Sequence, residues 1–236
     1  MEQQKQDFNI YIASDADFEF AEQICLEMEE SAKARGTGIA KRSPDYIRKK
    51  MMEGKAVIAL TKENAWAGFC YIETWGHGSY VANSGLIVSP LLRKSGLARL
   101  IKKKIFALSR EKYPDSKIFG LTTGLPVMKI NSELGYEPVT YSELTQDEDF
   151  WAGCKSCINY EILMSKERKN CMCTAMLYDP KDHYEPAETK EYFEQNAKGF
   201  ERLFRFKEWK LLRSFIKKDG KAIKSIKSFF SPLFNF

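Results

Sequence analysis

The 236-residue sequence contains no long uncharged apolar run, and its first seven residues are mostly polar or charged. A membrane-spanning helix needs about 20 predominantly apolar residues, and an export signal needs an apolar segment close to the N-terminus. The sequence therefore predicts neither a membrane span nor a signal peptide. We expect the protein in the cytoplasm.

The greater part of the chain also lacks a surplus of positive charge. The net charge is +5, but residues 197–236 hold 11 Lys and Arg against 3 Asp and Glu, which leaves 26 against 29 elsewhere. A nucleic-acid-binding protein usually presents a strongly basic surface. The distribution therefore predicts no nucleic-acid partner and confines the basic character to the C-terminal part.

A change of composition near residue 179 predicts two parts. The first is a domain of residues 1–178, and the second is a helical, basic extension of residues 179–236. In the extension, aromatic and aliphatic residues accompany a ladder of lysines, which is typical of an amphipathic helix. Such a face docks on its own domain, on a second copy in a homodimer or on an anionic membrane, and protein docking is the commonest of these.

A basic turn that contains glycine lies between an apolar strand and a helix. Beyond Gly96 the apolar residues recur at helical spacing, and the free N–H groups of a first helical turn bind anions. We expect Ser95 to cap this helix. The apolar face of the predicted helix comprises Leu97, Leu100, Ile101, Ile105 and Leu108. The predicted phosphate site comprises Arg93, Lys94, Ser95, Gly96, Leu97 and Ala98.

The spacing Arg93-x-x-Gly96-x-Ala98 resembles the Arg/Gln-x-x-Gly-x-Gly/Ala signature of the GCN5-related N-acetyltransferases, the GNAT superfamily. The hydrophobic pattern around it predicts the order of elements that this family shows, over about residues 8–140. We therefore expect a mixed α/β fold with a mostly antiparallel sheet flanked by helices. The predicted strands are 8–13, 56–60, 66–75, 80–88, 117–122 and 136–139, and a final strand returns near 173–177.

The resemblance implies that acyl-coenzyme A lies between two splayed strands, 80–88 and 117–122. The pantetheine arm would lie along Leu86, Ile87 and Val88, and the pyrophosphate in the turn at residues 93–98. Gly85 either forms a bulge that opens the splay or is a glycine tolerated at a strand edge.

Acyl transfer from a thioester to an amine requires a proton acceptor for the amine and a proton donor for the departing thiolate. Many GNAT enzymes place a tyrosine four residues before a Gly-Phe/Tyr pair as the donor, but here Asn131 stands at that distance from Gly135. Asn131 can hydrogen-bond the cofactor but cannot act as an acid. Glu73 and His77 are candidates for the base, and solvated bystanders are the alternative interpretation for both.

The acceptor is predicted from the loop before the second helix. Lys41 and Arg42 there can clamp a carboxylate, and Thr122 and Thr123 can add hydroxyl donors, although a solvated basic loop explains the two cations equally well. These groups favour a small carboxylate-bearing amine, such as an amino acid, over a polyamine.

The sequence of residues 36–45 and 150–180 also resembles that of GNAT proteins of arginine biosynthesis, in which glutamate receives an acetyl or succinyl group. This resemblance implies an N-acylglutamate synthase that uses acetyl-CoA or succinyl-CoA. Two alternatives are a GNAT enzyme for another amine (a protein N-terminus, a lysine or an antibiotic) and a non-catalytic domain that binds acyl-CoA.

Six cysteines in a chain without an export signal are not expected to form disulfides. Cys25 and Cys70 lie in apolar patterns typical of a core. The other four form two close pairs that suit a tetrahedral zinc ion, and reduced, unligated thiols are the alternative. The predicted zinc ligands are Cys154, Cys157, Cys171 and Cys173.

Overall fold

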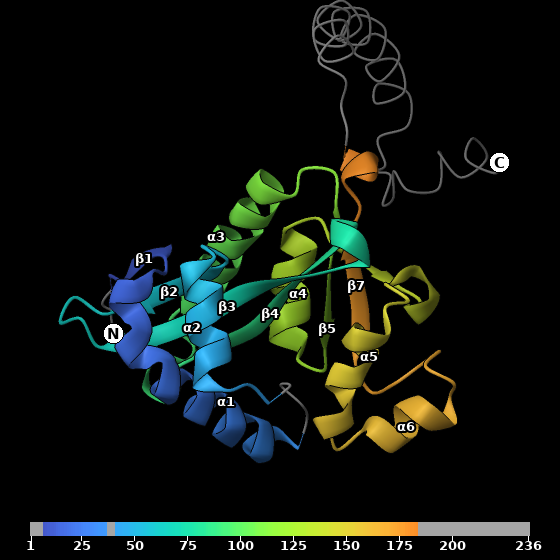
Figure 1. Ribbon diagram of the computed structural model, residues 1–236, viewed down its shortest axis with the longest axis horizontal. Helices are drawn as coiled ribbons and strands as arrows, with labels where there is room; N and C mark the ends of the chain where they lie inside the picture. The colour runs from blue at the N-terminus through green and yellow to red at the C-terminus, as the bar shows by residue number, and fades with distance from the viewer. Residues whose placement is uncertain (1–6, 37–40, 184–236) are drawn as a thin grey trace, which may run out of the picture. The chain divides into compact units, whose positions relative to one another are not determined.

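The computed structural model describes residues 7–36 and 41–183, which build a seven-stranded sheet. Helices cover this sheet on both of its faces (Figure 1). The strands lie in the order β1-β2-β3-β4-β5-β7-β6, and β4 and β5 are parallel while the other neighbours are antiparallel. The predicted mixed α/β class is thereby confirmed. The strands are β1 Asn9–Ile12, β2 Ala56–Leu60, β3 Trp66–Trp75, β4 Tyr80–Val88, β5 Lys117–Thr122, β6 Glu137–Val139 and β7 Thr174–Tyr178.

The helices begin and end where the local sequence provides caps. The Ser43 side chain accepts a hydrogen bond from the Tyr46 N–H at the start of α2, and Gly36 ends α1 in the left-handed conformation. The predicted cap of α3 is wrong, because Gly96 rather than Ser95 holds the N-cap position, at φ 85°. The α-helices are α1 Ala21–Arg35, α2 Pro44–Met52, α3 Leu97–Lys112, α4 Leu125–Glu133, α5 Glu148–Ala152 and α6 Tyr160–Ser165.

Each face of the sheet has its own core. On one face α3 packs on alternate residues of β2, β3 and β4. On the other face α1 and α2 cover the first strands, and residues of α5 and α6 cover the last ones. Because successive strand residues point to opposite faces, the parity of a residue decides which core it enters. Leu100 is exposed, against expectation, while Lys102 is buried against the sheet.

A bulge interrupts the pairing of β3 with β4. Phe69 pairs with Ile87 and Tyr71 with Ser84, so two β4 residues face one β3 residue. Gly85 sits in this bulge at φ 64°, and a Cβ there would lie 2.3 Å from Cε1 of Tyr71. The bulge interpretation of Gly85 is confirmed, because another side chain fits neither the conformation nor the space.

Before the chain reaches the bulge, β4 and β5 separate. They pair from Tyr80 with Lys117 to Ala82 with Phe119, whereas β7 pairs along the other edge of β5 from Ile118 to Thr122. The predicted splay between these strands is therefore present. It opens at the level of Asn83 and Gly120, in the middle of the sheet.

The C-terminal part of the described chain holds the main departures from expectation. Two short helices fill residues 148–165, and β7 returns between β5 and β6, a position that the sequence analysis did not specify. The compact unit extends to His183, because Asp179 pairs with Lys117 at 2.9 Å and the His183 ring stacks on Tyr178. The rest of the predicted extension, 184–236, lies outside the described residues. In the part that is described, no helix has the length and apolar character of a membrane span.

Candidate functional site

Two adjoining cavities meet where β4 and β5 separate. The larger cavity, of about 550 Å³, lies on the face covered by α2 and α5. The smaller one, of about 250 Å³, runs between the splayed strands and is called the slot below. The two cavities share the lining residues Arg42, Ser84, Leu121, Phe150 and Cys173. A molecule lying in the slot would therefore reach the larger cavity directly.

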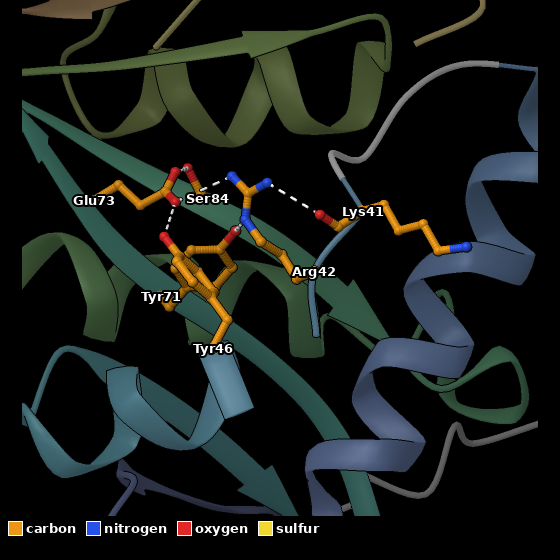
Figure 2. A network of polar contacts seen from close by, with 6 residues as sticks. All are labelled: Lys41, Arg42, Tyr46, Tyr71, Glu73 and Ser84. Carbon is orange, nitrogen blue, oxygen red and sulfur yellow. Dashed lines mark hydrogen bonds and ion pairs between the residues drawn. The ribbon is translucent and has the colours of Figure 1, made fainter. Parts of the chain in front are cut away.

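Glu73 is the centre of a polar network in the larger cavity (Figure 2). Its Oε1 accepts hydrogen bonds from Arg42, at 3.1 Å from Nη2, and from the hydroxyl of Tyr46. Its Oε2 accepts from Ser84 Oγ at 3.1 Å. The Glu73 side chain is 8% exposed, so this carboxylate is buried but fully hydrogen-bonded.

Three elements bring this network together. Glu73 and Tyr71 point to the same face of β3, and the Tyr71 hydroxyl accepts a hydrogen bond from Arg42 Nε at 3.0 Å. Tyr46 lies in the first turn of α2, and Arg42 precedes that helix. Burial and the neighbouring Glu73 carboxylate raise the pKa of both tyrosines well above the ordinary range, so both hydroxyls stay protonated.

The predicted substrate residues divide between the two cavities. Lys41 lines the larger cavity, but its side chain points toward α1, where Nζ lies 3.5 Å from Glu29 (Figure 2). Thr122 and Thr123 line the slot, and Thr122 Oγ1 also accepts a hydrogen bond from the Gly124 N–H. Of these residues, Arg42 alone is part of the Glu73 network and lines both cavities.

Asn131 lies on α4 and lines the slot. Its side chain is buried, its Nδ2 lies 3.7 Å from Met176 Sδ, and no hydrogen-bond donor reaches its Oδ1 within the described residues. An unsatisfied buried amide oxygen is costly. The slot thus presents a polar group that is ready for a ligand.

Sequence reasoning missed Lys102 of α3, which also lines the slot. Only 2% of this residue is exposed, and its Nζ donates to Asn83 Oδ1 at 3.3 Å. Burial lowers the pKa of the Lys102 ammonium group to about 8. The sequence did contain a signal for Lys102. It lies one residue after Ile101 and three before Ile105, and is therefore close to the apolar face of the helix that packs on the sheet.

The predicted phosphate turn stands at the end of β4, outside the lining of both cavities. Lys94, Ser95 and Gly96 are exposed, and Ser95 Oγ donates to the Leu92 carbonyl at 2.7 Å. Arg93 is turned toward α1, where its Nη2 lies 2.8 Å from both Glu27 Oε1 and Ser31 Oγ. Its charge is near the turn but already paired.

The remaining residues of the predicted cofactor site are mostly buried in the protein. Ile87, Val88 and Leu97 have exposed fractions of 8% or less, and Ala98 is partly buried against the core. Leu86 lines the slot. Backbone groups of β4, rather than these side chains, would contact a pantetheine arm.

His77 is not part of the site. It lies exposed in the turn between β3 and β4, at φ 54°, and lines neither cavity. The left-handed backbone of this turn reverses the chain direction between β3 and β4, and the imidazole is left in solvent. Of the two candidates for the base, Glu73 is the one that the structure brings to the cavity.

The four predicted zinc ligands all line the larger cavity. Burial and the neighbouring thiols raise the pKa of Cys154 to about 11 and of Cys173 to about 12, so these two are neutral thiols. Within residues 7–36 and 41–183, no group of three or more His, Cys, Asp or Glu side chains is arranged to hold a metal ion. The zinc prediction therefore has no support in this structure.

No family model matches the sequence, and no curated protein matches it. Solved structures do match. N-acetylglutamate synthase from Neisseria gonorrhoeae, complexed with coenzyme A and N-acetyl-glutamate, superposes with a TM-score of 0.52 at 16% identity. The match covers 73% of this chain and 35% of the synthase, so the chain spans about a third of that protein's length.

Two further structures match at the same level. Rv2747 from Mycobacterium tuberculosis, in complex with CoA and NLQ, has a TM-score of 0.52 at 14% identity, over 72% of this chain and 98% of that one. The yncA protein of Salmonella typhimurium, with its cofactor acetyl-CoA, has a TM-score of 0.52 at 13% identity, over 76% and 98%. The predicted resemblance to the GNAT acetyltransferases is thereby confirmed as a shared fold.

Proposed function

We propose that this protein is an acyl-CoA-dependent N-acyltransferase with a small amine as acceptor. The observation that carries the proposal is the slot through the sheet, which opens into a cavity containing a buried carboxylate. The three solved structures described above contain CoA or acetyl-CoA, which supports a thioester as the ligand of the slot. The acyl group would then lie where the two cavities meet, beside Ser84.

The bulge at Gly85 has a chemical role in this proposal. A bulged residue leaves backbone groups outside the strand ladder, and a free N–H group can polarise the thioester carbonyl. The amine nitrogen attacks the carbonyl carbon, a C–N bond forms, and the C–S bond breaks. Glu73 accepts the proton that the amine loses, directly or through one water, while Arg42 and Tyr46 hold its carboxylate in place.

The charges of the larger cavity favour an amino acid as the acceptor. Arg42 lines it together with Glu73 and Asp149, so groups of both signs lie in the cavity that would hold one carboxylate and one amine. The synthase of Neisseria gonorrhoeae was crystallised with N-acetyl-glutamate. We therefore propose glutamate as the acceptor and acetyl-CoA or succinyl-CoA as the donor, as in arginine biosynthesis.

The test is an acceptor screen. The purified protein is incubated with acetyl-CoA or succinyl-CoA and each member of an amino-acid panel, and products are identified by mass spectrometry while free CoA is measured. N-acylglutamate formation supports the full proposal. Another acylated amine supports the enzyme but overturns glutamate, and CoA binding without any product identifies a non-catalytic acyl-CoA-binding domain.

A further inference from the structure

The slot contains a buried positive charge that the proposed amine chemistry does not use. The Lys102 ammonium group lies on the α3 face of the sheet, at the level where β4 and β5 separate. A lysine ammonium has three donors, and Asn83 Oδ1 is its acceptor among the residues that the structure describes. At least one N–H is thus free to reach a molecule in the slot.

The surroundings of Lys102 are polar but carry no opposing charge. Asn83 of β4 also accepts from the Tyr136 hydroxyl at 3.0 Å and donates to Ser109 Oγ at 2.7 Å. The Lys102 Nζ lies 5.1 Å from the centre of the Tyr136 ring, and Cys70 of β3 is the titratable group that couples to it. No carboxylate pairs with Lys102 in residues 7–36 and 41–183.

A buried ammonium without a carboxylate partner is strongly destabilising unless some anion compensates its charge. The proposed reaction generates one anion inside the slot, the thiolate of CoA. The sequence supplies no acid from α4, because Asn131 occupies the position that faces the slot there and an amide cannot give up a proton. Among the described residues that line the slot, Lys102 is the one lysine, and its ammonium group can give up a proton.

We infer that Lys102 is the proton donor to the sulfur of the departing coenzyme A, an inference that rests on the proposed function. As the C–S bond breaks, the sulfur keeps the bonding electron pair and takes a proton from Nζ, which leaves free CoA thiol and a neutral lysine. The proton that the amine released on the other face goes to Glu73. Exchange with water then returns one proton to Lys102 and removes one from Glu73, so that the cycle is balanced.

The acidity of Lys102 suits this step. With a pKa of about 8, the Lys102 ammonium group is mostly protonated at neutral pH. This pKa is close to the ordinary pKa of a thiol, about 8.5. An acid matched to its leaving group in this way transfers the proton without a large energetic penalty in either direction. Asn83 and Tyr136 hold the ammonium in place and do not titrate in this range.

The experiment compares Lys102→Met with Lys103→Gln in the full chain. Methionine keeps the aliphatic stem of Lys102 and removes the buried charge, whereas Lys103 is an exposed lysine of the same helix. For Lys102→Met we expect kcat to fall about 100-fold while KM for acyl-CoA stays within about twofold, because the lost group acts on the leaving sulfur. The alkaline limb of the kcat profile, above about pH 8, should disappear in this variant. Lys103→Gln should match the wild type in kcat, in KM for acyl-CoA and in the alkaline limb of the kcat profile.

A second measurement does not depend on turnover. The thiol of bound CoA is titrated by its thiolate absorbance, and in the wild type it should ionise at lower pH than in Lys102→Met, because the ammonium stabilises the thiolate. Identical titrations in the two proteins would overturn the inference, and so would an unchanged kcat. If the wild type binds CoA but acylates no amine, the proposed function fails, and the thiol titration still decides whether Lys102 faces the sulfur.

Discussion

The two faces of the sheet, where the slot meets the larger cavity, are built on opposite principles. On the α2 face the Glu73 carboxylate is saturated with hydrogen bonds from Arg42, Tyr46 and Ser84. On the α3 face Lys102 has no carboxylate partner, and Asn131 Oδ1 has no donor within the described residues. The first face is preorganised and the second is incomplete.

This difference indicates which face waits for a ligand. Satisfied buried groups hold their geometry at little cost, whereas unsatisfied ones are destabilising until something pairs with them. In the proposed function the acceptor face is set before any substrate arrives, and the thioester arm would complete the α3 face. The following predictions test each side of this comparison.

The largest effect is expected where the two faces meet. In Gly85→Val the new side chain requires space occupied by Tyr71 and a left-handed backbone that valine avoids, so the bulge cannot form. We expect loss of acyl-CoA binding in equilibrium dialysis. The control Gly78→Ala has the same backbone strain, at φ 90°, but open space around its Cβ. It should lose about 1 kcal/mol of stability and keep its affinity. Wild-type affinity in Gly85→Val would refute the role of the bulge.

Glu73→Gln tests the preorganised face. The amide keeps the shape of the side chain but cannot accept a proton, so we expect kcat to fall about a thousandfold with acyl-CoA affinity unchanged. Steady-state kinetics and dialysis measure the two quantities. The exposed Glu63→Gln serves as the matched control. Should Glu73→Gln retain turnover, the base lies elsewhere.

Lys102→Met tests the incomplete face through stability. The Lys102 pKa is about 8 in the folded protein and 10.5 at its ordinary value, so the unfolded chain binds more protons between these pH values. The cost of the buried charge is therefore present below about pH 8 and is relieved as the pH rises toward 10.5. At neutral pH the variant should be more stable than the wild type by about 3 kcal/mol.

Urea unfolding at about pH 7 and about pH 10 measures this difference. The stability advantage of Lys102→Met should shrink at the higher pH, because the wild-type lysine is neutral there. An advantage that is absent, or that does not change with pH, would show that Lys102 is not buried as a charge.

The smallest effect is expected at the phosphate turn. Arg93 is already paired with Glu27, so Arg93→Gln removes mainly a long-range charge. We expect acetyl-CoA to bind about threefold more weakly at low salt, with the difference reduced at high salt. Dialysis at two salt concentrations measures it, and a hundredfold loss would place Arg93 directly on the pyrophosphate.

The fold was predictable wherever hydrophobic periodicity was strong. Strands at 56–60, 66–75, 80–88 and 117–122 have the predicted bounds, and the bulge at Gly85 was one of the two interpretations that an isolated strand glycine allowed. Where β7 enters the sheet was not predictable, because pairing between distant strands leaves no local pattern in one sequence. The two short helices in 148–165 were missed for a related reason, since their fold depends on packing over β5 and β7.

The site was predicted in part. Glu73, Arg42 and Asn131 were predicted from the sequence and line the two cavities, and their roles stay predictions, whereas Tyr46 and Lys102 also line the cavities and were missed. In the sequence, Lys102 looks like any exposed lysine of a basic helix. The structure instead buries Lys102 on the face of α3 that packs on the sheet, and leaves the apolar Leu100 exposed. The hydrophobic pattern of one sequence does not identify the buried face of a helix to within a single residue.

The central claim is that the gap between β4 and β5 accepts the arm of an acyl-CoA thioester. Equilibrium dialysis of the wild-type chain against labelled acetyl-CoA tests it most directly. The account predicts one saturable site per chain that unlabelled CoA competes for and that Gly85→Val abolishes. Absence of saturable binding by the folded wild-type protein would contradict it.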